Sequence, residues 1–302
     1  MKYFFDTEFI EGNQENPLML KSRLGHWMIG YPKPTIDLIS IGIVCEDGRE
    51  YYAISKDFNL KEAWNRYQLK TEIKINRLTG SQFSEEIKVR EYWIRENVLN
   101  PIFDELNIKD LKGQIESLKN YGYPMAKGIK KKDVEFSYSR MKYLIKKYGK
   151  SNEQIAKEIK TFVSSCEGQK YLENCPNIKT NVPKDFISYN DIQFYAYYAD
   201  YDWVAFCWLY GKMIDLPKGF PKYCIDLKQE FDRKLMLKST KMIGQIEAEG
   251  KSVPWRTADK YSLDERLKIF KSLARYPKQE NEHNALADAK WNFELYKFLK
   301  DL

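Results

Sequence analysis

The chain has 302 residues, 43% hydrophobic and 31% charged, a composition typical of a globular protein with one large domain or two modest ones. No apolar run approaches the roughly 20 residues that cross a bilayer, and the N-terminus lacks a signal-peptide layout, so we expect no membrane association. The five cysteines form no CxxC pair, and we interpret them as reduced thiols of a cytoplasmic protein. With only two histidines, zinc is not expected.

The net charge of +7 comes from one segment. Residues 109–150 hold eleven Lys and one Arg against four acids, so the rest of the chain is close to neutral. Six aromatic residues are interleaved with these cations: Tyr121, Tyr123, Phe136, Tyr138, Tyr143 and Tyr148. Such a pattern suits single-stranded nucleic acid, because phosphates meet Lys and bases stack on rings. A solvated helical surface whose tyrosines face the core would give the same pattern, so both interpretations stay open.

The first predicted elements are strands. The opening stretch "KYFFDTEFI" predicts a core strand that two carboxylates interrupt. Residues 11–35 are irregular, with glycine and proline as breakers. The stretch "TIDLISIGIVCEDGREYYAIS", residues 35–55, predicts a hairpin that turns at Glu46-Asp47-Gly48. Three strands therefore come early in the chain.

Two helical patterns follow. Residues 84–106 predict a helix that begins at a capping-box-like Ser84 and stops near Pro101 or soon after. Residues 151–166 predict a second helix with Ser151 as N-cap, and its apolar face is formed by Ile155, Ile159, Phe162 and Val163.

The last third alternates strands and helices. Residues 194–211 predict a buried strand running into a helix that ends at Gly211, and residues 222–226 predict a short strand before another helix. Residues 239–281 are polar and broken, and a terminal helix is expected over about 285–299. Three strands followed by helices alternating with two more strands predict an α/β protein around a mixed sheet, in a single domain over 1–302.

Carboxylates occur in three places that local structure does not explain. Asp6 and Glu8 lie two positions apart on the opening strand, so they point to the same side, where like charges repel and unpaired burial is costly. Asp202 stands between a strand and a helix, and His283 precedes Asp288 by five positions at the start of the last helix. Each signal alone is weak: D-x-E is common, Asp202 could be an N-cap, and His283 could be a surface residue. Their order and context make the pattern specific.

Together these motifs resemble a known family. "YFFDTEFIEG", "DLISIGIVCEDGREYYAIS", "WIRENVLNPI", "ADYDWVAFCWLYG" and "NEHNALADA" resemble the DEDD superfamily of 3′–5′ exonucleases, in its histidine (DEDDh) branch, and more closely the bacterial ribonuclease AS-like 3′–5′ exoribonucleases. The resemblance implies a ribonuclease H-like fold, with a five-stranded mixed sheet of order 3-2-1-4-5 flanked by helices. It covers rather more than half of the chain and leaves out inserts at about 11–35, 105–149 and 239–280.

The resemblance implies a role for each matching residue. Asp6, Glu8, Asp202 and Asp288 would be metal ligands for two Mg²⁺ or Mn²⁺ ions, with Asp6 bridging them, and His283 would be the general base. About four positive charges would make the clustered carboxylates favourable, and hard oxygen ligands are what such ions select. One ion would lower the pKa of a water and the other would stabilise the leaving 3′ oxygen. The neighbouring Asp200 is interpreted as a bystander, because Asp202 holds the motif position.

The expected substrate is a free 3′ end of single-stranded RNA, hydrolysed to nucleoside 5′-monophosphates. Phe9 and Ile10 could wedge against the terminal base, and Trp203 could line its pocket. For each of the three, general burial tendencies favour packing in the core over contact with a base by about two to one. An exonuclease on single-stranded DNA is the alternative, because residues that contact the 2′-hydroxyl cannot be recognised in the sequence. A binding module that has lost catalysis is a third possibility, and the resemblance also suggests a homodimer, which inserts of this size could block.

Overall fold

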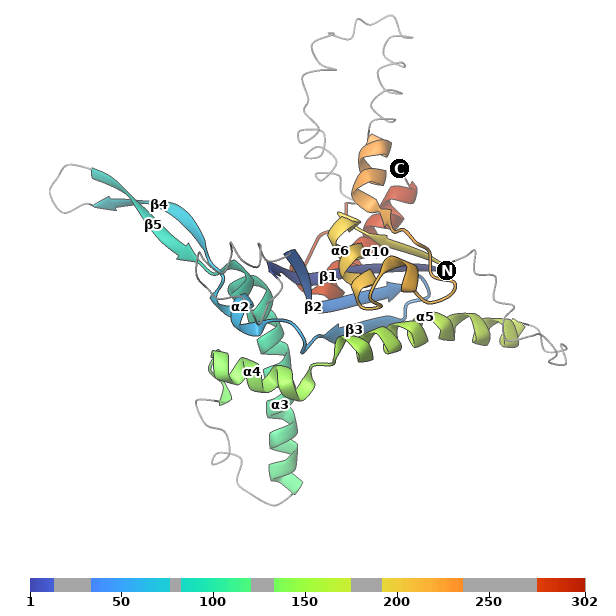
Figure 1. Ribbon diagram of the computed structural model, residues 1–302, viewed down its shortest axis with the longest axis horizontal. Coiled ribbons are helices and arrows are strands. Elements are labelled where there is room, and N and C mark those ends of the chain that lie inside the picture. The colour runs from blue at the N-terminus through green and yellow to red at the C-terminus, as the bar shows by residue number, and fades with distance from the viewer. Residues whose placement is uncertain (14–33, 77–82, 121–132, 175–191, 236–275, 302) are drawn as a thin grey trace, which may run out of the picture. The chain divides into compact units, whose positions relative to one another are not determined.

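The computed structural model describes residues 1–13, 34–76, 83–120, 133–174, 192–235 and 276–301 (Figure 1). The insert expected at about 11–35 lies almost wholly outside these residues, and so does most of the insert expected at 239–280. Among the described helices, none combines the length and apolar character needed to cross a membrane.

A five-stranded mixed sheet is built from strands β1 (Lys2–Asn13), β2 (Pro34–Cys45), β3 (Glu50–Ile54), β6 (Gln193–Ala196) and β7 (Ile225–Asp226), in the order β3-β2-β1-β6-β7 (Figure 1). Strand β6 pairs in parallel with both β1 and β7. If the five strands of this sheet are renumbered in chain order, β6 and β7 become the fourth and fifth strands, and the order agrees with the expected 3-2-1-4-5. The numbering differs because two further strands intervene in the chain and form a separate two-stranded sheet.

Strand β1 lies in the middle of the sheet because its apolar residues are core residues. Tyr3, Phe4 and Phe5 are completely buried, and Phe4 stacks on Tyr195 of the neighbouring strand with ring centroids 5.1 Å apart. The predicted hairpin is confirmed: the Gly48 amide donates to the Cys45 carbonyl at 2.9 Å, and Gly48 adopts a φ of +90° that its lack of a Cβ permits.

The predicted helices of the last half are largely confirmed. Helix α5 (Asn152–Asn174) buries Ile155, Ile159 and Val163, as its periodicity predicted. Helix α6 (Ala199–Trp208) follows β6, residues 227–235 are helical, and α10 (Ala285–Asp301) is the terminal helix. A short 3₁₀ turn covers Met213–Asp215.

The helix predicted over residues 84–106 is wrong in its first half. Residues Phe83–Glu91 form β5, which pairs antiparallel with β4 (Gln68–Asn76). In "SEEIKVRE" the apolar Ile87 and Val89 alternate with charged residues, and this period of two prevails once a partner strand is present.

The helical part of that segment begins later than predicted and runs further. After a π-helical turn over Arg95–Leu99, helix α3 spans Asn100–Asn120. Pro101 lies where the π-helical turn passes into α3, so it stands inside a continuous helical segment and does not end it. Two shorter helices complete this part: α2 (Leu60–Asn65) and α4 (Tyr138–Tyr148).

Contacts group the described chain into two compact units. The first contains residues 1–7, 40–53 and 152–302, and the second contains 8–39 and 54–151. The expectation of a single domain with inserts remains a prediction.

Two cations of the basic segment form ion pairs with a buried aspartate of the second unit. Asp110 of α3 is completely buried and forms ion pairs with Arg140 at 2.7 Å and Lys147 at 2.6 Å, both from α4. Burial opposes its charge, but hydrogen bonds from Lys147, Tyr148 and Arg140 prevail and hold the pKa of Asp110 well below its usual range. Arg140 and Lys147 therefore neutralise a buried charge and hold α4 against α3.

Other cations of the segment face solvent. Lys142 and Lys146 of α4 are exposed, one turn apart, while Met141, Leu144 and Ile145 on the opposite side of the helix are buried. Exposed lysines fit either interpretation of the basic segment, and nucleic-acid binding by this segment stays a prediction. Residues 121–132, which hold four of its lysines, lie outside the described part.

Helix α10 approaches the sheet closely over β2. A Cβ added to Gly42 would lie 2.3 Å from the Ala285 carbonyl oxygen and 2.4 Å from the Leu286 Cα. Only glycine at position 42 allows the start of α10 to reach this position.

We expect Gly42→Ala to lower the free energy of unfolding by about 1–3 kcal/mol, because backbone atoms of α10 must move away from the new methyl group. Gly113→Ala is the matched control: this helical glycine has open space around its Cβ position, so alanine should stabilise by about 0.5–1 kcal/mol. Urea unfolding measures both, and an unchanged Gly42→Ala variant would contradict the close approach.

Candidate metal centre

Three carboxylates from opposite ends of the chain form one cluster. Asp6 and Glu8 come from β1 and Asp288 from α10, and each offers an oxygen within 4.8 Å of the others. Glu8 and Asp288 are buried and Asp6 is half-buried. The alternation of β1 places the first two on one side, as predicted from their spacing. Like charges this close are unfavourable unless a cation neutralises them.

The start of α10 positions Asp288. The Asn284 carboxamide oxygen accepts from the Ala287 amide at 3.0 Å, so Asn284 caps the helix. The Asp288 carboxylate accepts from the backbone N–H of His283 at 2.9 Å and from the Gln279 side chain at 2.7 Å. Burial raises the pKa of Asp288, and these two hydrogen bonds oppose that shift.

His283 stands in the turn just before α10. Its φ of +67° is uncommon for a residue with a side chain. In this conformation its backbone N–H points at the Asp288 carboxylate. The backbone of the predicted base is therefore fixed to one of the clustered acids.

Asp202 is held next to the cluster by the residue between Asp6 and Glu8. Its carboxylate accepts from the Thr7 amide at 3.0 Å and from the Thr7 hydroxyl at 2.5 Å. The pKa of Asp202 is raised to about 7, mainly by burial; the charges of Asp226 and Asp288 add to this shift, and the two hydrogen bonds from Thr7 oppose it. Asp202 is not one of the three clustered acids, but Thr7, which binds it, stands between Asp6 and Glu8 on β1.

The other predicted residues differ in their surroundings. Ile10 is buried, with 1% of its surface exposed, and Phe9 is half-buried. Trp203 stacks on Phe206 with ring centroids 5.1 Å apart and contacts Phe5 edge-on, so its ring packs in the core. The bystander Asp200 is exposed.

Sequence reasoning missed three polar residues around the cluster. Thr7 binds Asp202, Gln279 binds Asp288, and Asn292, four residues after Asp288, donates to the Phe5 carbonyl at 3.0 Å. The spacing of Asn292 could have indicated it, since residues four apart share a helix face. Gln279 stands in a polar stretch and gave no signal.

Comparison with known proteins gives one short match. No protein-family model matches the chain. Over 63 residues the chain is 48% identical to 3′–5′ exoribonucleases of two Mycobacterium tuberculosis strains, CDC 1551 / Oshkosh and ATCC 25618 / H37Rv. The match covers 21% of this chain and 26% of each relative, so the chain matches about a quarter of the length of these curated proteins.

We expect Thr7→Val to lower the free energy of unfolding by about 1–3 kcal/mol, because a buried carboxylate then loses one of its hydrogen bonds. Thr7→Ser keeps the hydroxyl and should stay close to the wild type. Denaturant unfolding of the three proteins measures the difference. Equal stability of the valine and serine variants would show that the Thr7 hydroxyl does not support Asp202.

Proposed function

We propose that this protein is a metal-dependent 3′–5′ exoribonuclease that hydrolyses single-stranded RNA from a free 3′ end and releases nucleoside 5′-monophosphates. The supporting observation is the cluster of Asp6, Glu8 and Asp288, with Asp202 bound through Thr7 beside it. The short match to proteins named 3′–5′ exoribonucleases supports the same reaction.

The residues of the cluster fit hard divalent cations. Carboxylate oxygens are what Mg²⁺ and Mn²⁺ select, and buried carboxylates in one group gain most from a cation. When bound, two such ions would supply an activated water and neutralise the charge that develops at the phosphate. In our proposal Asp6, Glu8 and Asp288 hold the ions, and Asp202 completes the set from the adjacent position.

His283 acts as general base in this proposal. Imidazole is the side chain that exchanges a proton near neutral pH, so it can take the proton of the attacking water. The hydrogen bond from its backbone to Asp288 ties its position to the cluster. Loss of the imidazole should cost less activity than loss of a metal ligand.

The exposed cations of α4 offer a path for the phosphate backbone. Lys142 and Lys146 face solvent with no acidic residue on the same helix, so a polyanion would be attracted there. The cytoplasmic location and the homodimer remain predictions.

The sharpest test of the mechanism is Asp6→Asn, which keeps the shape of the side chain and removes its charge. We expect release of nucleotides from a 3′-hydroxyl RNA oligomer to fall by several orders of magnitude, because the cluster loses a ligand. Any rise in melting temperature on adding Mn²⁺ should shrink with it. Asp200→Asn, at an exposed aspartate, is the control and should behave as wild type. Full activity in Asp6→Asn would refute the metal assignment.

Matched RNA and DNA oligomers distinguish the substrate alternatives. With Mn²⁺ present, we expect the RNA to be shortened faster, because contacts to the 2′-hydroxyl separate the two substrates. Equal or faster loss of the DNA would favour the repair-type exonuclease. Binding without release of nucleotides from either oligomer would indicate a module that has lost catalysis.

A further inference from the structure

Strands β4 and β5 form a two-stranded sheet of their own within the second compact unit (Figure 1). Residues 68–73 of β4 and 88–90 of β5 are all exposed, on both faces of the sheet. Leu69 exposes 61% of its surface and Ile73 67%, which are high fractions for large apolar residues. Two strands with both faces in water bury little apolar surface, so such a pair gains stability from a partner.

The register of the two strands separates their charges between the faces. Directly paired residues share a face, and successive residues of a strand alternate. Among the described side chains, one face carries the cations Lys88 and Arg90 and the acid Glu86. The opposite face is net acidic, with the charged residues Glu72, Glu91 and Lys70.

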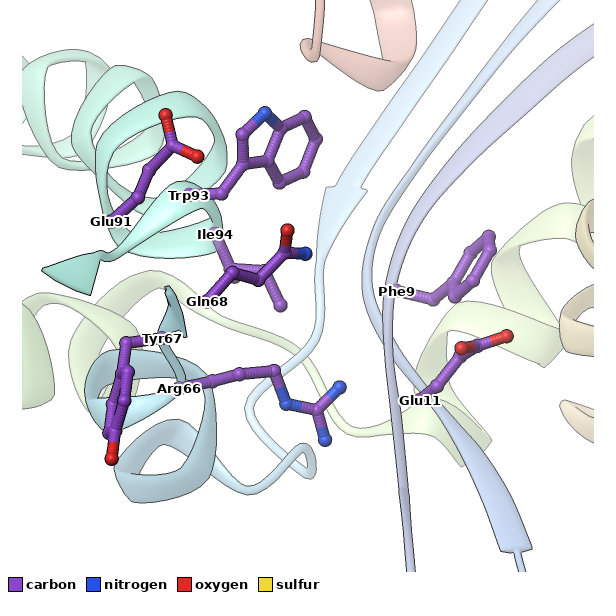
Figure 2. A pocket seen from close by; sticks show the side chains of 8 residues that line it. All are labelled: Phe9, Glu11, Arg66, Tyr67, Gln68, Glu91, Trp93 and Ile94. Carbon is purple, nitrogen blue, oxygen red and sulfur yellow. The ribbon is translucent and has the colours of Figure 1, made fainter. Parts of the chain in front are cut away.

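Four side chains on and beside the cationic face touch in sequence. The Arg90 guanidinium carbon lies 4.5 Å from the centroid of the Tyr67 ring, and the Tyr67 and Tyr92 ring centroids are 5.9 Å apart. The Arg95 guanidinium carbon lies 3.8 Å from the centroid of the Tyr92 ring. These are distances of cation–π and aromatic contacts. Figure 2 shows the Tyr67 ring pointing away from the Gln68 side chain. These four residues form an arginine–tyrosine row: Arg90, Tyr67, Tyr92 and Arg95.

The two arginines of this row keep their hydrogen-bonding edges. Within the part of the chain that the structure describes, the guanidiniums of Arg90 and Arg95 form no ion pair and no hydrogen bond. A guanidinium that lies on a ring has its N–H donors in its own plane, where they match the oxygens of a phosphate. By contrast, Lys70 on the opposite face is already paired with Glu91 at 3.2 Å.

The planar groups of the row favour a polyanion that carries bases. Cations alone attract any polyanion, but a flat guanidinium can also stack on a base. Arg90 is exposed, so a base can stack on the side of its guanidinium that Tyr67 does not cover. Bases are free to stack in this way on a single strand, where they are not paired.

We propose that the arginine–tyrosine row, with Lys88 beside it, is a binding surface for single-stranded nucleic acid. The guanidiniums of Arg90 and Arg95 contact phosphates, and one base stacks on Arg90. The inference goes beyond the proposed function, because it concerns binding alone and needs neither a metal ion nor the clustered carboxylates.

Binding of a labelled oligouridylate in EDTA, at several salt concentrations, tests the surface without hydrolysis. Arg90→Gln removes the charge and the guanidinium, so it should weaken binding and lower the slope of log affinity against log salt by about 0.7, the value for one phosphate contact on a single strand. Lys70→Gln is the matched control, because it makes the same change of charge on the opposite face of the same two strands. It should keep the affinity and the slope of the wild type.

Arg90→Lys separates stacking from charge. It keeps the cation and loses the planar group, so it should keep the salt slope and still weaken oligouridylate binding about 5- to 10-fold, the lower end of what one stacked base contributes. Polyphosphate, a polyanion without bases, is the matched ligand. Its affinity should fall in Arg90→Gln and stay unchanged in Arg90→Lys.

Both positions are exposed, so the melting temperature of each variant should equal that of the wild type. The proposal is overturned if the wild type does not bind oligouridylate, or if Arg90→Gln binds it with unchanged affinity and slope. Full affinity of Arg90→Lys beside weakened binding by Arg90→Gln would show selection by charge alone, as for an acidic peptide, and would also overturn the assignment to nucleic acid.

The two proposals fail in different ways. If the wild type with Mn²⁺ releases no nucleotide but both Arg90 variants weaken binding, the arginine–tyrosine row stands as a binding surface and the exonuclease activity is refuted. If RNA is hydrolysed and both Arg90 variants bind it as tightly as wild type, the activity stands and the binding surface is refuted.

Discussion

Carboxylates as close as those of Asp6, Glu8 and Asp288 repel one another, and the rest of the site can be understood from how the fold holds them together. Two of them lie on the central strand, whose buried aromatic residues anchor it on both sides of the sheet. The third lies in the first turn of α10, which reaches β2 because Gly42 has no side chain. Packing energy spread over the core therefore opposes a local electrostatic cost, and a divalent cation would remove that cost.

Backbone groups do much of the positioning. The Thr7 amide binds Asp202, the His283 amide binds Asp288, and the Asn292 side chain binds the Phe5 carbonyl. These bonds join β1, α6 and α10 around the cluster. Each of these bonds has a main-chain atom on one side, so the paths of the strand and the helices help to position the acids, and the Thr7 hydroxyl and the Asn292 carboxamide add side-chain contacts.

The second compact unit contributes different chemistry. Its ion pairs around Asp110 join α3 to α4 and use two cations of the basic segment, for which the sequence left open a nucleic-acid surface or a solvated helical surface. A cavity of this unit is lined by residues of both signs of charge and by partly exposed aromatic rings (Figure 2), and α4 exposes two lysines to solvent.

Periodic patterns in the sequence determined most of the sheet and of its helices. The core strand with two carboxylates on one side, the hairpin at Gly48, the buried face of α5 and the helix beginning near His283 all follow from contiguous residues, because the periods of strands and helices are local. Only the tertiary structure decided that residues 83–91 form a strand, that Thr7 binds Asp202, and that Asp110 neutralises Arg140 and Lys147. In each of these cases the partner stands far away in the chain: 21 residues separate Lys70 from Glu91 across the β4–β5 pair, and 195 separate Thr7 from Asp202. A local pattern carries no information about such a partner, so the fold itself had to supply it.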